Sequence, residues 1–138
     1  MRLLFIDSGV LIAASRGTDN VAQKAFDVIN DPDVEFASSI FVQLETLPKP
    51  AYFKNNAELE FLETFFENVF VWVEPSNDLT HLALDEAITN GLGAVDALHV
   101  AAAIQGGADE LVTAEKPEAA LNRVSSIPVR FIAPAEHA

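Results

Sequence analysis

The sequence predicts an α/β domain in which a parallel sheet of about five strands is flanked by helices in three layers. Short apolar runs alternate with longer segments in which apolar residues recur at helical spacing, which is the pattern of βα units. Most of the short runs are apolar throughout, as is typical of strands covered on both faces. The length of 138 residues and the apolar fraction of 50% suit one domain with its own core. We therefore expect residues 1–138 to fold as a single domain.

Five runs rich in Val, Ile, Leu or Phe are the expected strands, at residues 2–7, 34–38, 69–73, 110–113 and 129–132. Apolar spacing and capping residues predict the helices between them, at residues 10–14, 20–29, 39–47, 58–68, 78–90 and 95–104. Thr18 or Asp19 is the expected N-cap of the second helix. We expect Pro48 and Pro50 to end the third helix, and Asn90-Gly91 to cap the end of the fifth.

The chain contains no cysteine, which excludes disulfides, thiolate zinc sites and cysteine nucleophiles. Oxygen and imidazole are the remaining ligand types, and they favour Mg²⁺ or Mn²⁺. No apolar stretch has the length of a membrane span or of a signal-peptide core. We therefore expect a cytoplasmic protein without membrane contact.

Eight basic and 21 acidic residues give a formal net charge of −13. A field of this sign repels phosphate backbones and counts against a nucleic-acid substrate. It does not exclude one, because salt screens net charge beyond about 8 Å while a bound cation or a local basic patch acts at shorter range. We expect a proline-bounded loop in which Lys49 and Lys54 flank Tyr52 and Phe53, and the two rings either stack on a base or pack on the domain or a partner.

Asp7 ends the first expected strand and precedes Ser8-Gly9, where the chain turns. Ligands of open α/β sheets bind at the carboxyl edge of the strands, so this carboxylate is a candidate site residue. Asp7 can instead be the N-cap of helix 10–14. A phosphatase of the aspartyl-nucleophile type needs a second Asp at the position of Gly9, which disfavours that activity.

Glu115 follows the fourth expected strand in Thr113-Ala114-Glu115, at the same edge of the sheet. It can instead be a loop acid before a helix that starts at the following proline. Glu45 lies near the end of helix 39–47, where a lone acid is usually at the surface.

Asp96 opens a helix that is apolar nearly all round and is therefore expected to be buried. An acid in its first turn costs free energy unless it caps the helix, pairs with another group or binds a metal. His99 lies one turn further on the same side, and we expect it to be a hydrogen-bonded core residue instead of a metal ligand.

These segments together resemble the PIN domain, in the right order and over almost the whole chain, and most of all the small VapC-like toxins of bacterial toxin–antitoxin pairs. The resemblance rests on Asp7-Ser8-Gly9-Val10-Leu11-Ile12 after an apolar strand, Glu45 within residues 39–47, Asp96-Ala97-Leu98-His99-Val100-Ala101-Ala102, and Thr113-Ala114-Glu115.

The resemblance implies a Mg²⁺- or Mn²⁺-dependent endoribonuclease site at one end of the sheet. The acids that match Asp7, Glu45 and Asp96 line the metal pocket of that family, and Glu115 stands where the family normally has an aspartate. Ser8 and Thr113 match hydroxyl positions that support the pocket. We expect Asp7 and Asp96 to anchor the first ion, with Glu45 and Glu115 in its outer shell or around a second ion, so that an acidified water attacks an RNA phosphodiester.

The same resemblance implies an antitoxin partner and a homodimer, with Phe41, Leu44 and Tyr52-Phe53 as possible dimer contacts. One alternative is a catalytically silent PIN-like binding module. Another is a phosphoacceptor receiver domain, which needs an acceptor Asp at the end of the third strand, where this chain has Val73-Glu74-Pro75.

Overall fold

The computed structural model describes residues 1–136, in which five parallel strands form one sheet of order β3-β2-β1-β4-β5. The prediction of an α/β fold with a parallel five-stranded sheet is confirmed. Receiver domains have the order 2-1-3-4-5, so the sheet does not support that alternative. The strands are β1 (Arg2–Ile6), β2 (Val34–Ser39), β3 (Val71–Val73), β4 (Glu110–Thr113) and β5 (Val129–Phe131).

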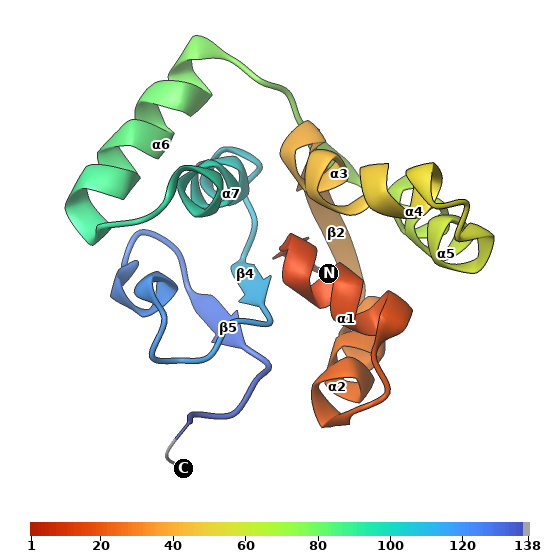
Figure 1. Cartoon of the computed structure of the whole chain (residues 1–138). Helices are drawn as coiled ribbons and strands as arrows, with labels where there is room; N and C mark the ends of the chain where they lie inside the picture. Colours follow the sequence, from red (N-terminus) through yellow and green to blue (C-terminus); the bar gives the residue numbers. More distant parts are fainter. Residues whose placement is uncertain (137–138) are drawn as a thin grey trace.

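Helices cover both faces of the sheet (Figure 1). α1, α2 and α5 lie on one face, while α7 lies on the other with α6 packed against it. A parallel strand can follow another only through a crossover connection, and these helices are the connections. The helices are α1 (Ser8–Arg16), α2 (Asn20–Ile29), α3 (Ile40–Thr46), α4 (Pro48–Tyr52), α5 (Asn56–Glu67), α6 (Asn77–Asn90) and α7 (Ala94–Gln105), with a 3₁₀ turn at Ala120–Arg123.

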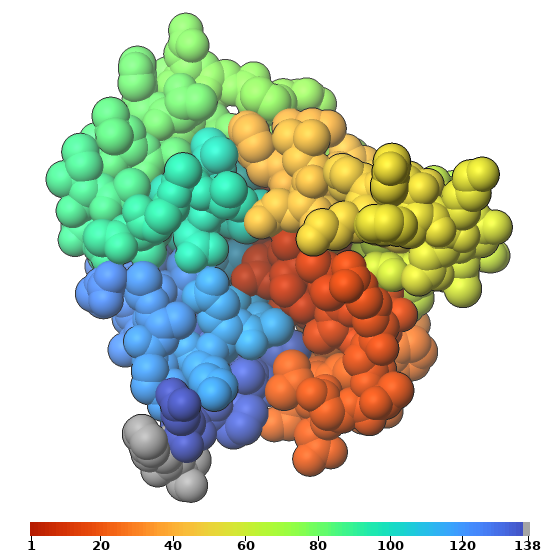
Figure 2. All heavy atoms as spheres, in the orientation of Figure 1, coloured from red at the N-terminus to blue at the C-terminus, as the bar shows by residue number. Residues whose placement is uncertain are grey.

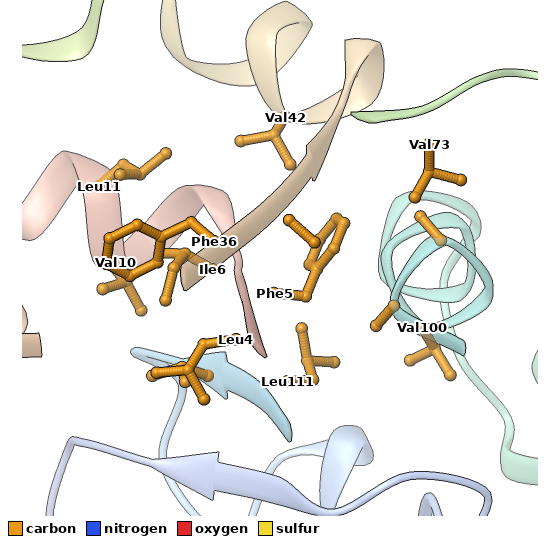
Figure 3. Close-up of a cluster of buried hydrophobic side chains, with 14 of the residues drawn as sticks. Leu4, Phe5, Ile6, Val10, Leu11, Phe36, Val42, Val73, Val100 and Leu111 are labelled. Carbon is orange, nitrogen blue, oxygen red and sulfur yellow. The ribbon is translucent and has the colours of Figure 1, made fainter. Parts of the chain in front are cut away.

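The core lies on both faces of the central strand β1. Figure 3 shows Phe5 between Val73 and Val100 on one side, and Val10 and Leu11 of α1 beside Ile6 on the other. Phe5 and Ile6 are both fully buried. Because consecutive residues of a strand point to opposite faces, an uninterrupted apolar run such as 3–6 fits a strand covered by helices twice over.

Local sequence determines most helix ends as predicted. The Asp19 side chain caps α2 by accepting from the Ala22 N–H at 2.9 Å, and Gly91 ends α6 in the left-handed conformation with φ 65°. Positive φ is accessible to glycine without a Cβ clash, which is why glycine is favoured there.

The prediction for residues 48–54 was wrong. The prolines do end α3, but Pro48 also opens a second helix, α4, because the first turn of a helix needs no N–H donor from its leading residues. A helix starting directly at the proline after Glu115 is absent from the described residues, and the turn there begins at Ala120. The third strand is shorter than residues 69–73, since only Val71–Val73 pair with β2.

No single helix in residues 1–136 is long and apolar enough to cross a membrane, although α6 and α7 pass the length and composition criteria as a pair bent by 118°.

Candidate functional site

A pocket of about 250 Å³ opens at the carboxyl edge of β1 and β4, beside the starts of α1 and α7 and the end of α3. In Figure 2 the segments that form it, coloured red, orange, teal and blue, meet near the centre of the face shown. All four predicted acids line it. The lining residues are Asp7, Ser8, Gly9, Glu45, Asp96, His99, Ala114 and Glu115.

A larger hollow of about 560 Å³ lies between α2 and α5 and is lined mainly by apolar side chains, including Phe26 and Phe61. Glu60 is the one ionisable side chain among its lining residues, and the other polar ones are Asn30, Thr64 and Asn68. The smaller pocket is therefore the candidate functional site.

Asp7 both caps α1 and lines the pocket, so the two roles considered for it are compatible. Its Oδ1 accepts from the Val10 N–H at 3.2 Å, and its own N–H donates to the Val112 carbonyl at 3.0 Å. Burial raises the pKa of the Asp7 carboxyl, while hydrogen bonds from the Thr113 side chain and the Val10 N–H oppose the shift. Thr113 does not line the pocket, but it holds an acid that does.

Glu45 is held by two neighbours. Ser8 Oγ donates to Glu45 Oε1 at 2.5 Å, and His99 Nε2 lies 2.6 Å from the same oxygen. The hydrogen bond from His99 is the main reason that the pKa of Glu45 is lowered, ahead of the opposing effect of burial. This acid is therefore ionised and fixed in orientation at neutral pH.

His99 is almost fully buried, as expected for a hydrogen-bonded core residue, but it also lines the pocket. Its Nδ1 is buried without a partner among the described residues. A buried lone pair costs less than a buried N–H without an acceptor, so we assign the proton to Nε2, which donates to Glu45. The spacing of Asp96 and His99, one helical turn apart, was the one sequence signal that this histidine faces the site.

Asp96 does not cap α7, so the capping alternative was wrong. The N-cap is Gly93, and no side-chain hydrogen bond caps this helix. Burial raises the pKa of Asp96, the charge of Glu45 adds to the shift, and His99 and a hydrogen bond with Glu115 oppose it. An acid in this first turn gains from the helix dipole but still lacks a cation.

The Glu115 N–H donates to Thr113 Oγ1 at 3.1 Å, and its carboxyl lies beside that of Asp96 in the pocket. Burial is the main cause that raises the pKa of Glu115, and the charges of Asp96 and Asp7 add to the shift.

The donors fit a hard divalent cation in chemistry, because they are oxygens whose mutual repulsion a cation would relieve. No salt bridge in residues 1–136 involves Asp7, Asp96 or Glu115. In the same part of the chain, however, no three His, Asp or Glu side chains form a ready ligand set for a metal ion. Glu45 is hydrogen-bonded to Ser8 and His99, and the carboxyl of Asp96 lies beside that of Glu115.

Comparison with known proteins identifies the family. A family model described as "PIN domain" matches residues 4–121. No curated protein that was compared matches the chain.

Solved structures with the same fold include VapBC2 from Rickettsia felis bound to promoter DNA, at 17% identity and a TM-score of 0.68, covering 94% of this chain and 98% of that one. A toxin–antitoxin complex from Klebsiella pneumoniae gives 15% identity and a TM-score of 0.73, covering 95% and 98%. VapC20 from Mycobacterium tuberculosis, a toxin that cleaves the sarcin–ricin loop, gives 18% identity and a TM-score of 0.60, covering 78% and 86%. The family model spans most of the sequence, and this chain belongs to the PIN domain family.

Proposed function

We propose that this protein is an endoribonuclease that depends on Mg²⁺ or Mn²⁺ and hydrolyses RNA phosphodiester bonds. The observation that carries the proposal is the convergence of four acids, distant in the sequence, on one pocket at the sheet edge. Three of them have raised pKa values and no salt-bridge partner within residues 1–136. Membership of the PIN family supports a nuclease, since PIN nucleases generally depend on divalent metals.

In this proposal Asp7 and Asp96 hold the ion, and Glu45 and Glu115 complete its outer shell or hold a second one. Bound there, the ion would acidify a water and offset negative charge on the phosphate. Ser8 and His99 keep Glu45 ionised and oriented. Thr113 hydrogen-bonds Asp7 and the backbone of Glu115, so it holds these two acids in position relative to each other.

We further propose that the enzyme is the toxin of a toxin–antitoxin pair, acting on RNA in the cytoplasm and forming a homodimer. The structural neighbours are described as toxin–antitoxin complexes, and one of them as an RNA-cleaving toxin. Exposed apolar side chains favour a protein partner, notably Leu44 at 62% exposure and Ile88 at 73%. The strong negative charge argues for a narrow choice of RNA.

The second candidate is a catalytically silent PIN-like module. One observation favours it, because the side chains are engaged with one another and do not form a ready ligand set within residues 1–136. A silent module binds its partner without cleaving RNA, so it predicts no response to divalent ions. The experiment below separates the two.

Replacing Asp7 or Asp96 by Asn should abolish cleavage while preserving the fold. Asparagine keeps the shape of each side chain, and at position 7 it can still cap α1. We expect the rate of cleavage of total bacterial RNA in Mn²⁺ to fall at least about a hundredfold, equivalent to about 2.7 kcal/mol of transition-state stabilisation. Product length on denaturing gels is the measurement.

The matched control is Glu63→Gln, which removes one carboxylate from the exposed face of α5. It should cleave as the unmodified chain does. Undiminished cleavage by well-folded Asp7→Asn and Asp96→Asn proteins would contradict the nuclease assignment.

A further inference from the structure

Two aromatic side chains at the end of α4 are exposed to solvent. Tyr52 and Phe53 are 78% and 73% exposed, and their rings form an edge-to-face pair with centroids 5.0 Å apart. Pro50, in the same short helix, is buried against the domain. Exposed rings of this size cost free energy in water, so they need an explanation beyond folding.

Two cations without an ion pair lie in this helix and just beyond its end. Among residues 1–136, Lys24, Lys49 and Lys54 have no salt-bridge partner, whereas Arg2, Arg16, Lys116 and Arg130 each pair with a glutamate. Arg123 donates instead to the Asn90 carbonyl. In a chain of net charge −13, two free lysines therefore flank the exposed aromatic pair. We call Lys49, Tyr52, Phe53 and Lys54 the aromatic–lysine platform.

Lys54 is held in a backbone conformation that favours glycine. Its φ is 55°, and no other non-glycine residue of the described chain has positive φ. It occupies the left-handed position of a Schellman motif, in which the Asn55 N–H donates to the Pro50 carbonyl at 2.8 Å and the Lys54 N–H to the Ala51 carbonyl at 3.3 Å. Residues in strained backbone conformations cluster at functional positions, which makes the Lys54 side chain a candidate for binding.

A hollow of about 280 Å³ lies beside the platform, lined by Arg16, Lys49, Pro50, Phe53, Asn55 and Glu58. Glu58 is buried and accepts from Arg16 Nε at 2.7 Å and from Asn55 Nδ2 at 2.9 Å. The guanidinium of Arg16 is half exposed and is held by this pair at the rim. A third cation thus lies next to the platform with its position fixed.

The platform follows the carboxylate pocket closely along the chain. Glu45 lies in the last turn of α3, four residues before Lys49, and α3 packs against α4. In Figure 2 the yellow segment around α4 projects from the same face, next to the orange α3.

We propose that the aromatic–lysine platform binds a single-stranded stretch of the RNA substrate next to the bond that is cut. This inference rests on the proposed function and adds to it the part of the surface that takes the RNA. Flat aromatic faces stack on bases of any sequence, and lysines beside them bind the backbone phosphates. The platform gives a strongly acidic protein a local positive surface, so that RNA approaches from this side.

The test is binding of a fluorescein-labelled single-stranded oligouridine, measured by anisotropy in EDTA so that nothing is cleaved. The double variant Tyr52→Ala/Phe53→Ala should bind at least about tenfold more weakly, since each stacked base contributes substantially. The variant Lys49→Gln/Lys54→Gln should lower the slope of log K against log salt by about 1.4, because each phosphate contact with a single strand contributes about 0.7.

Lys54→Gly separates binding from folding. Glycine relieves the backbone strain, so the melting temperature should not fall, while binding of the oligouridine should weaken. The matched controls are Phe70→Ala, an exposed ring before β3, and Lys24→Gln, an exposed cation on α2, and neither should change binding.

Unchanged binding by the platform variants, equal losses in the controls, or no binding by the unmodified chain would each overturn the proposal. So would a change of oligomeric mass in Tyr52→Ala/Phe53→Ala, which would make this surface a contact between protein chains. Because EDTA suppresses cleavage, the result is independent of the nuclease assignment. Binding through the platform without any cleavage in Mn²⁺ would refute the proposed function alone.

Discussion

At the level of single residues, the acids of the pocket fall into two groups. Glu45 accepts hydrogen bonds from Ser8 and His99 and has a lowered pKa. Asp7, Asp96 and Glu115 have raised pKa values, and burial is the main cause in each. Hydrogen bonds within the protein stabilise the charge of Glu45. The protein alone does not offset the negative charge of the other three acids.

Raised pKa values give the metal-free protein a defined pH dependence. A carboxyl whose pKa is higher in the folded than in the unfolded chain stabilises the fold fully below its unfolded pKa, about 4, and loses that contribution as pH rises through the folded value. In EDTA, Asp7→Asn should therefore be more stable than the unmodified chain at pH 7. Thermal unfolding should show this advantage shrink toward pH 4, and lower stability of Asp7→Asn at pH 7 would contradict the shift.

Glu115 provides a second test, because it stands where the family resemblance implies an aspartate. Glu115→Asp should preserve or increase cleavage in Mn²⁺, since a shorter acid after the same strand supplies the same ligand type. The rate of cleavage of the same RNA by both proteins is the measurement. A collapse of activity with an intact fold would mean that the longer side chain has a role of its own.

At the level of elements, the sequence predicted all five strands and six of the seven helices, with ends displaced by a few residues. Uninterrupted apolar runs and helical spacing are strong signals because they reflect burial directly. The exception is α4. Its prolines predict the end of α3 but not the start of a new helix, although proline both ends one helix and favours the first turn of the next.

The turn between α1 and α2 depends on close packing at Gly17. A Cβ there would lie 2.7 Å from Ala22 Cβ and 2.8 Å from the Ala13 carbonyl oxygen. Gly17→Ala should therefore destabilise the protein by about 1–3 kcal/mol, as overpacking does, measured by urea unfolding.

Gly93→Ser is the matched control. A Cβ at Gly93 meets nothing within 4 Å, and serine at the N-cap of α7 can bind a free N–H of that helix. Its stability should equal or exceed that of the unmodified chain. Equal losses at both positions would mean that the turn is not the critical feature.

At the level of the whole molecule, the parallel sheet explains why acids distant in the sequence line one pocket. Every strand of such a sheet ends at the same edge, so residues after β1 and β4 become neighbours. Strand ends could therefore be predicted as site positions from the sequence. Side-chain partners could not, because the hydrogen bonds of Glu45 to His99 and to Ser8 depend on packing between distant elements.

Net charge is the other property of the whole molecule, and its effect on RNA binding depends on where the charged side chains lie. Arg2 and Arg130 both pair with Glu110, at the sheet end opposite the pocket, where β4 begins. These cations do not contribute to RNA binding near the acids. The field around the pocket is thus strongly negative, which disfavours RNA but favours a divalent cation.

Thermal unfolding with and without Mn²⁺ tests the central claim, that the four acids form a cation site, most directly. A site that binds only the folded chain should stabilise it by about 2.7 kcal/mol when Mn²⁺ is at a hundred times its dissociation constant. We expect a clear rise in the melting temperature of the unmodified chain, and little or none in the Asp7→Asn/Asp96→Asn double variant. The same melting temperature with and without Mn²⁺, or an equal rise in both proteins, would contradict the account.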